Sequence, residues 1–271
     1  MSTRIHPTAV VSPEAELGDQ VEIGPYVVVE ADVSIGSGTR LQTAVVIKRY
    51  TRIGSECEIH TGAVIGDVPQ DRNFKPCRSW VVIGDGSIVR ECVTIHRGTT
   101  EESCTRLGKN CFLMALSHVA HDCVLGNNVV LANGALVAGH VQIGDGAFIS
   151  GNCLLHQFVR VGRLAMLGGG AGVSKDVPPF CLVAPLQLNT VSGLNVVGLR
   201  RAGVSARSRT ALRRAFRSIF CSGQNLRNAA AEFAGRDQED ALVRELAGFV
   251  LESGRGVCRF RAAKETDETG L

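Results

Sequence analysis

The sequence has few aromatic residues and no apolar run long enough to span a membrane. Aromatics make up 5% of the 271 residues, although 45% of the chain is hydrophobic. The core must therefore be built mainly from Val, Ile, Leu and Ala, which is typical of short strands stacked in regular layers. No apolar run approaches the ~20 residues needed to cross a bilayer, and the first residues lack the apolar stretch of a secretory signal. We expect a cytoplasmic protein without a membrane span.

The ten cysteines and the small net charge give no sign of disulfides, a cysteine-bound metal or a nucleic-acid partner. No Cys-x-x-Cys pair occurs, and a chain of this length does not need disulfides to hold its fold. The net charge of +3 argues neither for nor against nucleic acid, so no such partner is expected. Four cysteines occupy one position of the repeat described next, shared with Ala, Val, Ser and Thr: Cys57, Cys111, Cys123 and Cys153. They are expected to be reduced and buried.

An aliphatic residue recurs at every sixth position of the sequence. The series runs from Val11 to Ile65, resumes at Ile83 and continues from Leu107 to Val173, with a second inward residue two positions before each member. No amphipathic helix has a period of six, whereas inward residues at i−2 and i are typical of strands. Three strands per turn predict a triangular prism in which residues three hexapeptides apart stack about 4.8 Å from each other. Counting from Val11 to Val173 in steps of three hexapeptides then predicts nine turns.

Two segments interrupt the repeat, and the last part of the chain has a different period. Residues 67–80 and 97–105 place polar residues where aliphatic ones belong, so loops extruded from the prism are expected there. After Thr190 the spacing of apolar residues becomes helical. We therefore predict an all-β fold, a parallel β-helix over residues 1–189, followed by a small α-helical domain over residues 190–271.

The start of this helical region carries charge of one sign. Between residues 190 and 231 there are eight arginines and no acidic residue. A solvated helix face would ordinarily mix both signs, so this concentration favours an acidic partner. The arginines are Arg200, Arg201, Arg207, Arg209, Arg213, Arg214, Arg217 and Arg227.

Counting in steps of three hexapeptides gathers four of the seven histidines at one corner of the predicted prism, over three successive turns. They are His118, His121, His140 and His156. The same count places Gly139 one turn above His121 and Asp122 one turn below His140. Two other histidines share a separate column and are predicted to lie on another face: His60 and His96.

Three interpretations of this cluster are open. The histidines could be structural, or three of them could bind zinc with an open coordination position, as in carbonic anhydrases built on hexapeptide prisms. In the third interpretation His121 is a general base whose tautomer is set by Asp122, and an N–H near Gly139 stabilises an oxyanion. The acid–base interpretation fits the residues best.

Several motifs in the chain are more specific than the repeat. They are residues 95–99 (IHRGT), 117–123 (SHVAHDC), 138–140 (AGH), 156–158 (HQF), 176–179 (DVPP) and 193–201 (GLNVVGLRR). Together they resemble the UDP-N-acetylglucosamine acyltransferase family, which opens lipid A biosynthesis. The resemblance covers almost the whole chain, and it implies a left-handed β-helix and a homotrimer with active sites in the clefts between neighbouring prisms.

The resemblance also implies roles for individual residues. His121 would take the proton of the sugar 3-hydroxyl as that oxygen attacks an (R)-3-hydroxyacyl thioester on acyl carrier protein, with Asp122 orienting His121 and the Gly139 amide forming the oxyanion hole. No cofactor is implied beyond the 4'-phosphopantetheine of the carrier. Other positions match substrate-binding residues: Asp71, His118, His140, His156, Gln157, Asn195 and Arg201. Met166 and Gly169 match the positions that set acyl-chain length.

The chain departs from the family at three places. Asn73 stands where a lysine is usual, Ala202 replaces an arginine, and residues 185–188 replace a Gly-Asn turn. Alternatives are the same transfer to a 3-amino UDP-sugar, a zinc enzyme resembling carbonic anhydrase, or a catalytically silent homologue. The later N-acyltransferase of the pathway has an extra N-terminal domain, for which a repeat beginning by Val11 is expected to leave no room.

Overall fold

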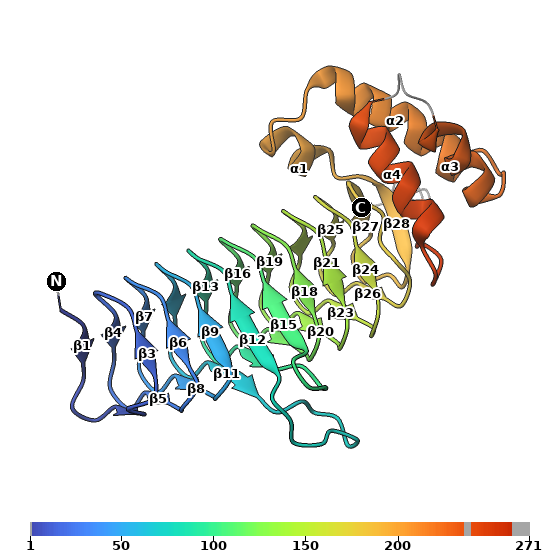
Figure 1. The fold of residues 1–271 in the computed structure, drawn as a ribbon. Coiled ribbons are helices and arrows are strands. Elements are labelled where there is room, and N and C mark those ends of the chain that lie inside the picture. The colour runs from blue at the N-terminus through green and yellow to red at the C-terminus, as the bar shows by residue number, and fades with distance from the viewer. Residues whose placement is uncertain (1, 236–239, 262–271) are drawn as a thin grey trace, which may run out of the picture.

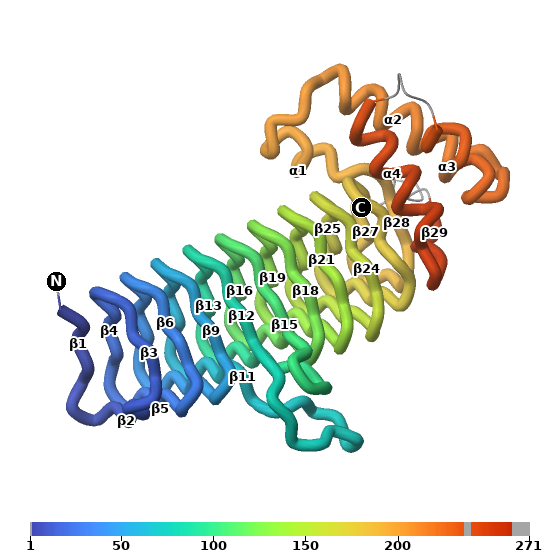
Figure 2. The backbone as a smooth tube through the Cα atoms, in the orientation of Figure 1, coloured from blue at the N-terminus to red at the C-terminus, as the bar shows by residue number. Residues whose placement is uncertain are grey.

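A three-sided parallel β-helix forms most of the protein, and a group of helices packs at its C-terminal end (Figures 1 and 2). The computed structural model describes residues 2–235 and 240–261. Each side of the prism is one sheet whose strands pair in parallel with the strand one turn away, as at Val119 and Val137. The predicted parallel β-helix is therefore confirmed.

The strands of each sheet, in spatial order, are as follows. Sheet A contains β1 (Arg4–Ile5), β4 (Glu22–Ile23), β7 (Arg40–Leu41), β10 (Glu58–Ile59), β13 (Ile88–Val89), β16 (Phe112–Leu113), β19 (Val130–Leu131), β22 (Phe148–Ile149), β25 (Met166–Leu167), β27 (Cys181–Val183), β28 (Thr190–Leu194) and β29 (Arg259–Phe260). Sheet B contains β2 (Val10–Val11), β5 (Val28–Val29), β8 (Val46–Ile47), β11 (Val64–Asp67), β14 (Thr94–His96), β17 (His118–Val119), β20 (Leu136–Val137), β23 (Leu154–Leu155) and β26 (Gly172–Val173). Sheet C contains β3 (Glu16–Leu17), β6 (Ser34–Ile35), β9 (Thr51–Ile53), β12 (Trp80–Ile83), β15 (Cys104–Leu107), β18 (Val124–Leu125), β21 (Gln142–Ile143) and β24 (Arg160–Val161).

The inward side chains of the three sheets form one continuous aliphatic core. Val, Ile and Leu dominate it, and Phe180 is a rare aromatic among its fully buried side chains. The four cysteines of the repeat are buried and unpaired in this core, as predicted. Burial raises the pKa of the Cys123 thiol to about 12, so this sulfur stays protonated and behaves as a small hydrophobe.

The number of turns differs from the prediction. Ile65 pairs with Ile95 and Ile95 pairs with Val119, so each of these two turns is longer than the regular three hexapeptides. The additional residues form the loops that leave the prism between β11 and β12 and between β14 and β15. Together they take up one full turn of chain, so Val11 and Val173 are separated by eight turns, not nine. At the usual strand spacing this part of the prism is about 38 Å tall.

The C-terminal region begins with a strand and ends with another. β28 pairs antiparallel with β27, and β29 then pairs with β28, so both extend sheet A. The helices between them are α1 (Val196–Arg201), α2 (Ala206–Cys221), α3 (Leu226–Ala234) and α4 (Ala241–Glu252). The change of spacing after Thr190 predicted helix from that point, but residues 190–194 form strand β28 and the first helix begins at Val196. Over the described residues no helix combines the length and apolar character needed to cross a bilayer.

Candidate active site

One corner of the prism carries a hydrogen-bonded histidine–carboxylate pair. The chain leaves β17 and turns through His121 and Asp122 before β18 begins. Asp122 has a φ of 58°, and its backbone N–H donates to the hydroxyl of Thr105 at 2.8 Å. This turn places a carboxylate oxygen of Asp122 3.0 Å from Nδ1 of His121. Only 10% of the His121 side chain and 11% of the Asp122 side chain are exposed, so the pair is largely shielded from water.

The loop between β14 and β15 keeps the Asp122 carboxylate charged. Thr99 donates to it from its hydroxyl at 2.6 Å and from its backbone N–H at 3.2 Å. Burial acts to raise the pKa of Asp122, but hydrogen bonds, above all from Thr99, outweigh burial and hold the pKa below its usual value. An ionised Asp122 fixes the His121 proton on Nδ1, which leaves the lone pair of Nε2 free to accept a proton.

The ring of His121 lies against the backbone of Gly139, one turn further along the prism. A Cβ atom at position 139 would lie 2.5 Å from Nε2 of His121 and 2.3 Å from its Cε1. These distances are too short for any side chain, so the close approach requires glycine. Among the described residues none accepts a hydrogen bond from the Gly139 N–H. That donor is therefore available to a molecule bound beside Nε2 of His121.

A second imidazole completes the corner. His140 stacks one turn above Asp122, with its Nε2 3.8 Å from the carboxylate. Its ring meets the ring of His121 edge to face, with centroids 5.1 Å apart. The other side of the His140 ring stacks on Phe158 at 4.5 Å with an interplanar angle of 4°. Phe158 therefore fixes the orientation of His140 beside the His121–Asp122 pair.

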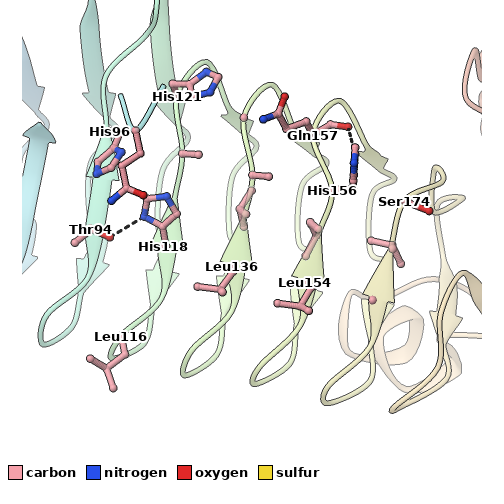
Figure 3. Close-up of a pocket in the computed structure, with 18 of the residues that line it drawn as sticks. Thr94, His96, Leu116, His118, His121, Leu136, Leu154, His156, Gln157 and Ser174 are labelled. Carbon is pink, nitrogen blue, oxygen red and sulfur yellow. Dashed lines mark hydrogen bonds between the residues drawn. The ribbon is translucent and has the colours of Figure 1, made fainter. Parts of the chain in front are cut away.

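A cleft of about 780 Å³ runs along sheet B next to this corner (Figure 3). His121 and Gly139 line its middle, together with Leu136 and Leu154, which are 45% and 55% exposed. Polar residues line both ends of the cleft: Thr94, His96 and His118 at one, and His156, Gln157 and Ser174 at the other. The cleft can therefore accept a molecule with both apolar and polar parts.

The end of the cleft at β14 and β17 contains two closely packed histidines, of which His96 is buried and His118 is half-buried. The rings of His96 and His118 meet edge to face with centroids 4.8 Å apart, and Nδ1 of His118 lies 2.7 Å from the hydroxyl of Thr94. Burial, together with the neighbouring histidines, lowers the pKa of His118 to about 4. Burial also lowers the pKa of His96. At neutral pH both rings are therefore uncharged and can act as hydrogen-bonding groups.

The sequence prediction for His96 was wrong, and that for His60 was right. His96 lies on sheet B beside His118, whereas His60 follows β10 of sheet A. The count in steps of three hexapeptides failed because the turn that contains Thr99 is longer than that. Because the count did not allow for these extra residues, it did not place Thr94 and Thr99 beside the histidine cluster. The IHRGT motif at residues 95–99 was the available signal for this region.

The structure brings some of the predicted site residues together and places others elsewhere. Seven lie in the cleft or directly beside it: His118, His121, Asp122, Gly139, His140, His156 and Gln157. Asp71 lies in the loop after β11, where its carboxylate accepts a hydrogen bond from the Asn73 N–H at 2.9 Å, while its neighbour Gln70 reaches the cleft.

Four further predicted residues, like Asp71, lie outside the cleft of this chain. Asn195 caps helix α1, where its side chain accepts from the Gly198 N–H and donates to the Leu164 carbonyl, both at 2.9 Å. Arg201 is exposed at the end of α1. Met166 lies on β25 in sheet A, and Gly169 lies in the following turn. For the described part of the chain, the cleft is therefore built without these four residues.

One group in the site has donors suited to a metal ion. His121, Asp122 and His140 each offer a ligand atom, and these atoms all lie within 4.8 Å of one another. The group differs from the three-histidine set considered from the sequence, because one donor is a carboxylate and His118 faces Thr94 instead. Nδ1 of His121 and the Asp122 carboxylate already satisfy each other at 3.0 Å. An ion bound through Nδ1 of His121 would have to replace the hydrogen bond that orients this ring.

Comparisons with known proteins agree on one family. Residues 176–258 match the family described as Udp N-acetylglucosamine O-acyltransferase, domain 2, and residues 104–139 match the bacterial transferase hexapeptide family. Acyl-[acyl-carrier-protein]–UDP-N-acetylglucosamine O-acyltransferases of Halorhodospira halophila and Alkalilimnicola ehrlichii are 44% and 48% identical, each over 95% of this chain and all of the relative. The structure of a UDP-N-acetylglucosamine acyltransferase from Campylobacter jejuni superimposes with a TM-score of 0.89 at 39% identity, covering 95% of this chain and all of that one. This likeness supports the predicted left-handed β-helix with a C-terminal helical region.

Proposed function

Because the chain belongs to the UDP-N-acetylglucosamine O-acyltransferase family, we propose that it transfers an (R)-3-hydroxyacyl chain from acyl carrier protein to the 3-hydroxyl of UDP-N-acetylglucosamine, the first step of lipid A biosynthesis. The observation that carries this proposal is the His121–Asp122 pair beside the free N–H of Gly139 within the cleft. Acyl transfer needs a base for the attacking hydroxyl and a donor for the oxyanion, and this corner provides both. Carrier protein and nucleotide sugar are both cytoplasmic molecules, which is the compartment we propose.

The arrangement accounts for each bond and proton in the reaction. Nε2 of His121 accepts the proton of the sugar 3-hydroxyl while the oxygen forms a bond to the thioester carbonyl carbon. The Gly139 N–H donates to the oxyanion of the tetrahedral intermediate, and Asp122 stabilises the imidazolium through Nδ1–H. Collapse of the intermediate breaks the carbon–sulfur bond. The thiolate of phosphopantetheine then takes the proton from His121, which restores the neutral base.

The remaining predicted residues are proposed to bind substrate. His118, His156 and Gln157 offer hydrogen bonds at the wall of the cleft, His140 offers one directly beside it, and the exposed leucines of the cleft suit an acyl chain. We propose a homotrimer in which a second chain closes the open side of the cleft. In that assembly Asp71, Asn195 and Arg201 would bind the nucleotide sugar at a cleft between chains. Met166 and Gly169 would limit acyl length.

The helical region is proposed to receive the carrier protein. Helix α2 exposes Arg207, Arg213 and Arg217, and its described residues include no acidic side chain. Acyl carrier protein is acidic, so a surface of this charge favours its approach over that of a basic partner. Binding through such a surface weakens as salt is added.

The decisive experiment assays purified protein with two acceptors and a series of hydroxyacyl carrier proteins. UDP-N-acetylglucosamine and its 3-amino analogue are each offered with acyl chains of increasing length, and product is measured by mass spectrometry. We expect an ester product with the 3-hydroxyl sugar. If an amide product forms only with the 3-amino sugar, that sugar is the acceptor instead of UDP-N-acetylglucosamine. Absence of any product would contradict acyl transfer.

A variant and a metal measurement test the role of His121. His121→Ala is expected to lower kcat by about 10²–10⁴-fold, the usual contribution of a general base, with an unchanged far-ultraviolet circular dichroism spectrum. Retained activity would contradict the assignment of His121 as the base. Metal content of the purified protein tests the zinc alternative at His121, Asp122 and His140. One tightly bound zinc per chain, required for activity, would favour metal chemistry over this mechanism.

A further inference from the structure

The chain returns to the cleft after its last helix. In Figures 1 and 2 the red segment that follows α4 lies beside the last strands of the prism. A buried carboxylate, Asp176, holds this segment in place. It accepts a hydrogen bond from the Ser253 hydroxyl at 2.8 Å, and its backbone bonds to the carbonyl of Gly256 at 3.0 Å and to the N–H of Cys258 at 2.8 Å. Gly256 has a φ of 73°, which allows the segment to turn. The turn is therefore a fixed part of the structure.

Arg255 occupies this turn and reaches the open end of the cleft. Its guanidinium donates to the carbonyl of Ser174 from Nε and from Nη2, both at 3.3 Å, and Nη2 lies 3.4 Å from Nδ1 of His156. Ser174 and His156 both line the cleft. The Arg255 side chain is exposed. A residue that follows the last helix therefore places a cation against two residues of the cleft that contains His121.

The charge of Arg255 is not neutralised by the described protein. Other arginines at the junction of prism and helices have acidic partners: Arg160 pairs with Glu252 and Arg163 pairs with Glu245. Within residues 2–235 and 240–261 no carboxylate lies within ion-pair distance of Arg255. A guanidinium with open donors at the mouth of a polar cleft is suited to a phosphate, which it can bind through two parallel N–H groups.

We propose that Arg255 binds a phosphate group of substrate at the open end of the cleft. This inference rests on the proposed function, which supplies two phosphate-bearing molecules: the diphosphate of the nucleotide sugar and the phosphodiester of the phosphopantetheine arm. The chemistry recognised is the same in both. The contacts to Ser174 and the proximity of His156 hold the guanidinium toward the cleft before substrate arrives, so little side-chain freedom is lost on binding.

The test compares Arg255→Gln with a matched control, Arg259→Gln. Arg259 is exposed on β29, a little further along the same segment, and its backbone N–H donates to the carbonyl of Asn189, which does not line the cleft. Steady-state kinetics with each substrate varied in turn are expected to show KM raised about tenfold for one of them in R255Q, with kcat within about twofold of wild type, and no change in R259Q. Inhibition by UDP alone and by 4'-phosphopantetheine alone identifies which phosphate has lost its partner.

A conservative variant separates binding from folding. Arg255→Lys keeps the charge and is expected to restore most of the affinity, while R255Q, R255K and wild type melt at the same temperature. Unchanged KM values for both substrates in R255Q would overturn the proposal, as would a fall in kcat alone. If wild type itself transfers no acyl group, the proposed function fails. If wild type is active and R255Q is indistinguishable from it, only the role of Arg255 fails.

Discussion

The two ends of the cleft differ in burial and in charge. At the end formed by β14 and β17, His96 is buried, His118 is half-buried, and the pKa of each is lowered. At the end formed by β23 and β26, His156 is exposed and lies beside the cation of Arg255. His121 lies between the two ends (Figure 3), and only 10% of its side chain is exposed. The same repeat therefore builds a shielded part suited to proton transfer and an open end suited to binding an anion.

The difference follows from the loops more than from the strands. The buried end lies where two turns contain extra residues, and these residues cover the corner and supply Thr99 to Asp122. At the open end the strands β20, β23 and β26 pair in regular steps of three hexapeptides, so its side chains project into solvent. Interrupting a regular repeat is thus the means by which this fold removes water from one part of a groove.

Closing the space beside His121 should have the largest effect among the variants that probe this contrast. Gly139→Ala places a Cβ where the His121 ring lies, so either the ring or the backbone N–H must move. We expect kcat to fall about 10²–10³-fold, the loss typical of a displaced oxyanion donor, with the oligomeric state unchanged. Gly248→Ala in α4 is the control, because a Cβ there meets no atom within 4 Å. Comparable kinetics for the two variants would contradict the proposed contact.

Removing the hydrogen bonds that keep Asp122 ionised should have a smaller and pH-dependent effect. Thr99→Val deletes the 2.6 Å hydroxyl contact, and one hydrogen bond to a charged group is worth about 1.5–3 kcal/mol. Because the pKa of Asp122 is lowered, its carboxylate is ionised and orients His121 at any pH above the ordinary pKa. This orienting effect is lost as the pH falls through the lowered value. In T99V the acid limb of the kcat profile should move to higher pH, with kcat about tenfold lower at neutral pH.

The control for this shift is Thr210→Val, whose exposed hydroxyl donates to the Ala206 carbonyl within α2 at 2.9 Å, and neither residue lines the cleft. Its pH profile should superimpose on that of wild type. An acid limb at the same pH in T99V would show that Thr99 does not determine the ionisation of Asp122.

Protonation of His118 should destabilise the fold. The pKa of His118 is lowered to about 4, whereas the unfolded chain has a histidine pKa of about 6.5. The unfolded state therefore binds the proton first, and stability is lost as the pH falls from about 6.5 to about 4. Urea unfolding of wild type and His118→Gln at pH 7 and pH 5 should show a pH dependence smaller by about 1–2 kcal/mol in the variant. His6→Gln, at an exposed site, should leave the dependence unchanged; an equal loss in both variants would contradict the assignment to His118.

The sequence predicted the regular turns of the prism better than the turns that loops interrupt. The sixfold period was sufficient for the prism, and counting in steps of three hexapeptides brought Gly139 beside His121 because no insertion separates them. The same count misplaced His96, because it included the extra residues of the loop predicted at residues 97–105, which lengthen the turn between Ile95 and Val119. The repeat gave no signal for Arg255, which the sequence marks only as part of the family-like tail at residues 254–257. Its place depends on how a helical region packs back onto the prism, and a local period contains no information on such long-range contacts.

The smallest effect is expected from loosening the loop that follows β11. The Arg97 guanidinium carbon lies 5.4 Å from the Tyr50 ring centroid and 5.7 Å from the Phe74 ring centroid, which ties the loop to the prism. Gln70 in that loop lines the cleft. Phe74→Leu removes a cation–π contact worth about 0.5–1 kcal/mol, so we expect KM for the nucleotide sugar to rise about two- to fivefold with kcat unchanged. Phe112→Leu on sheet A should leave KM as in wild type. If F74L also leaves KM unchanged, the loop does not need this contact to cover the buried end.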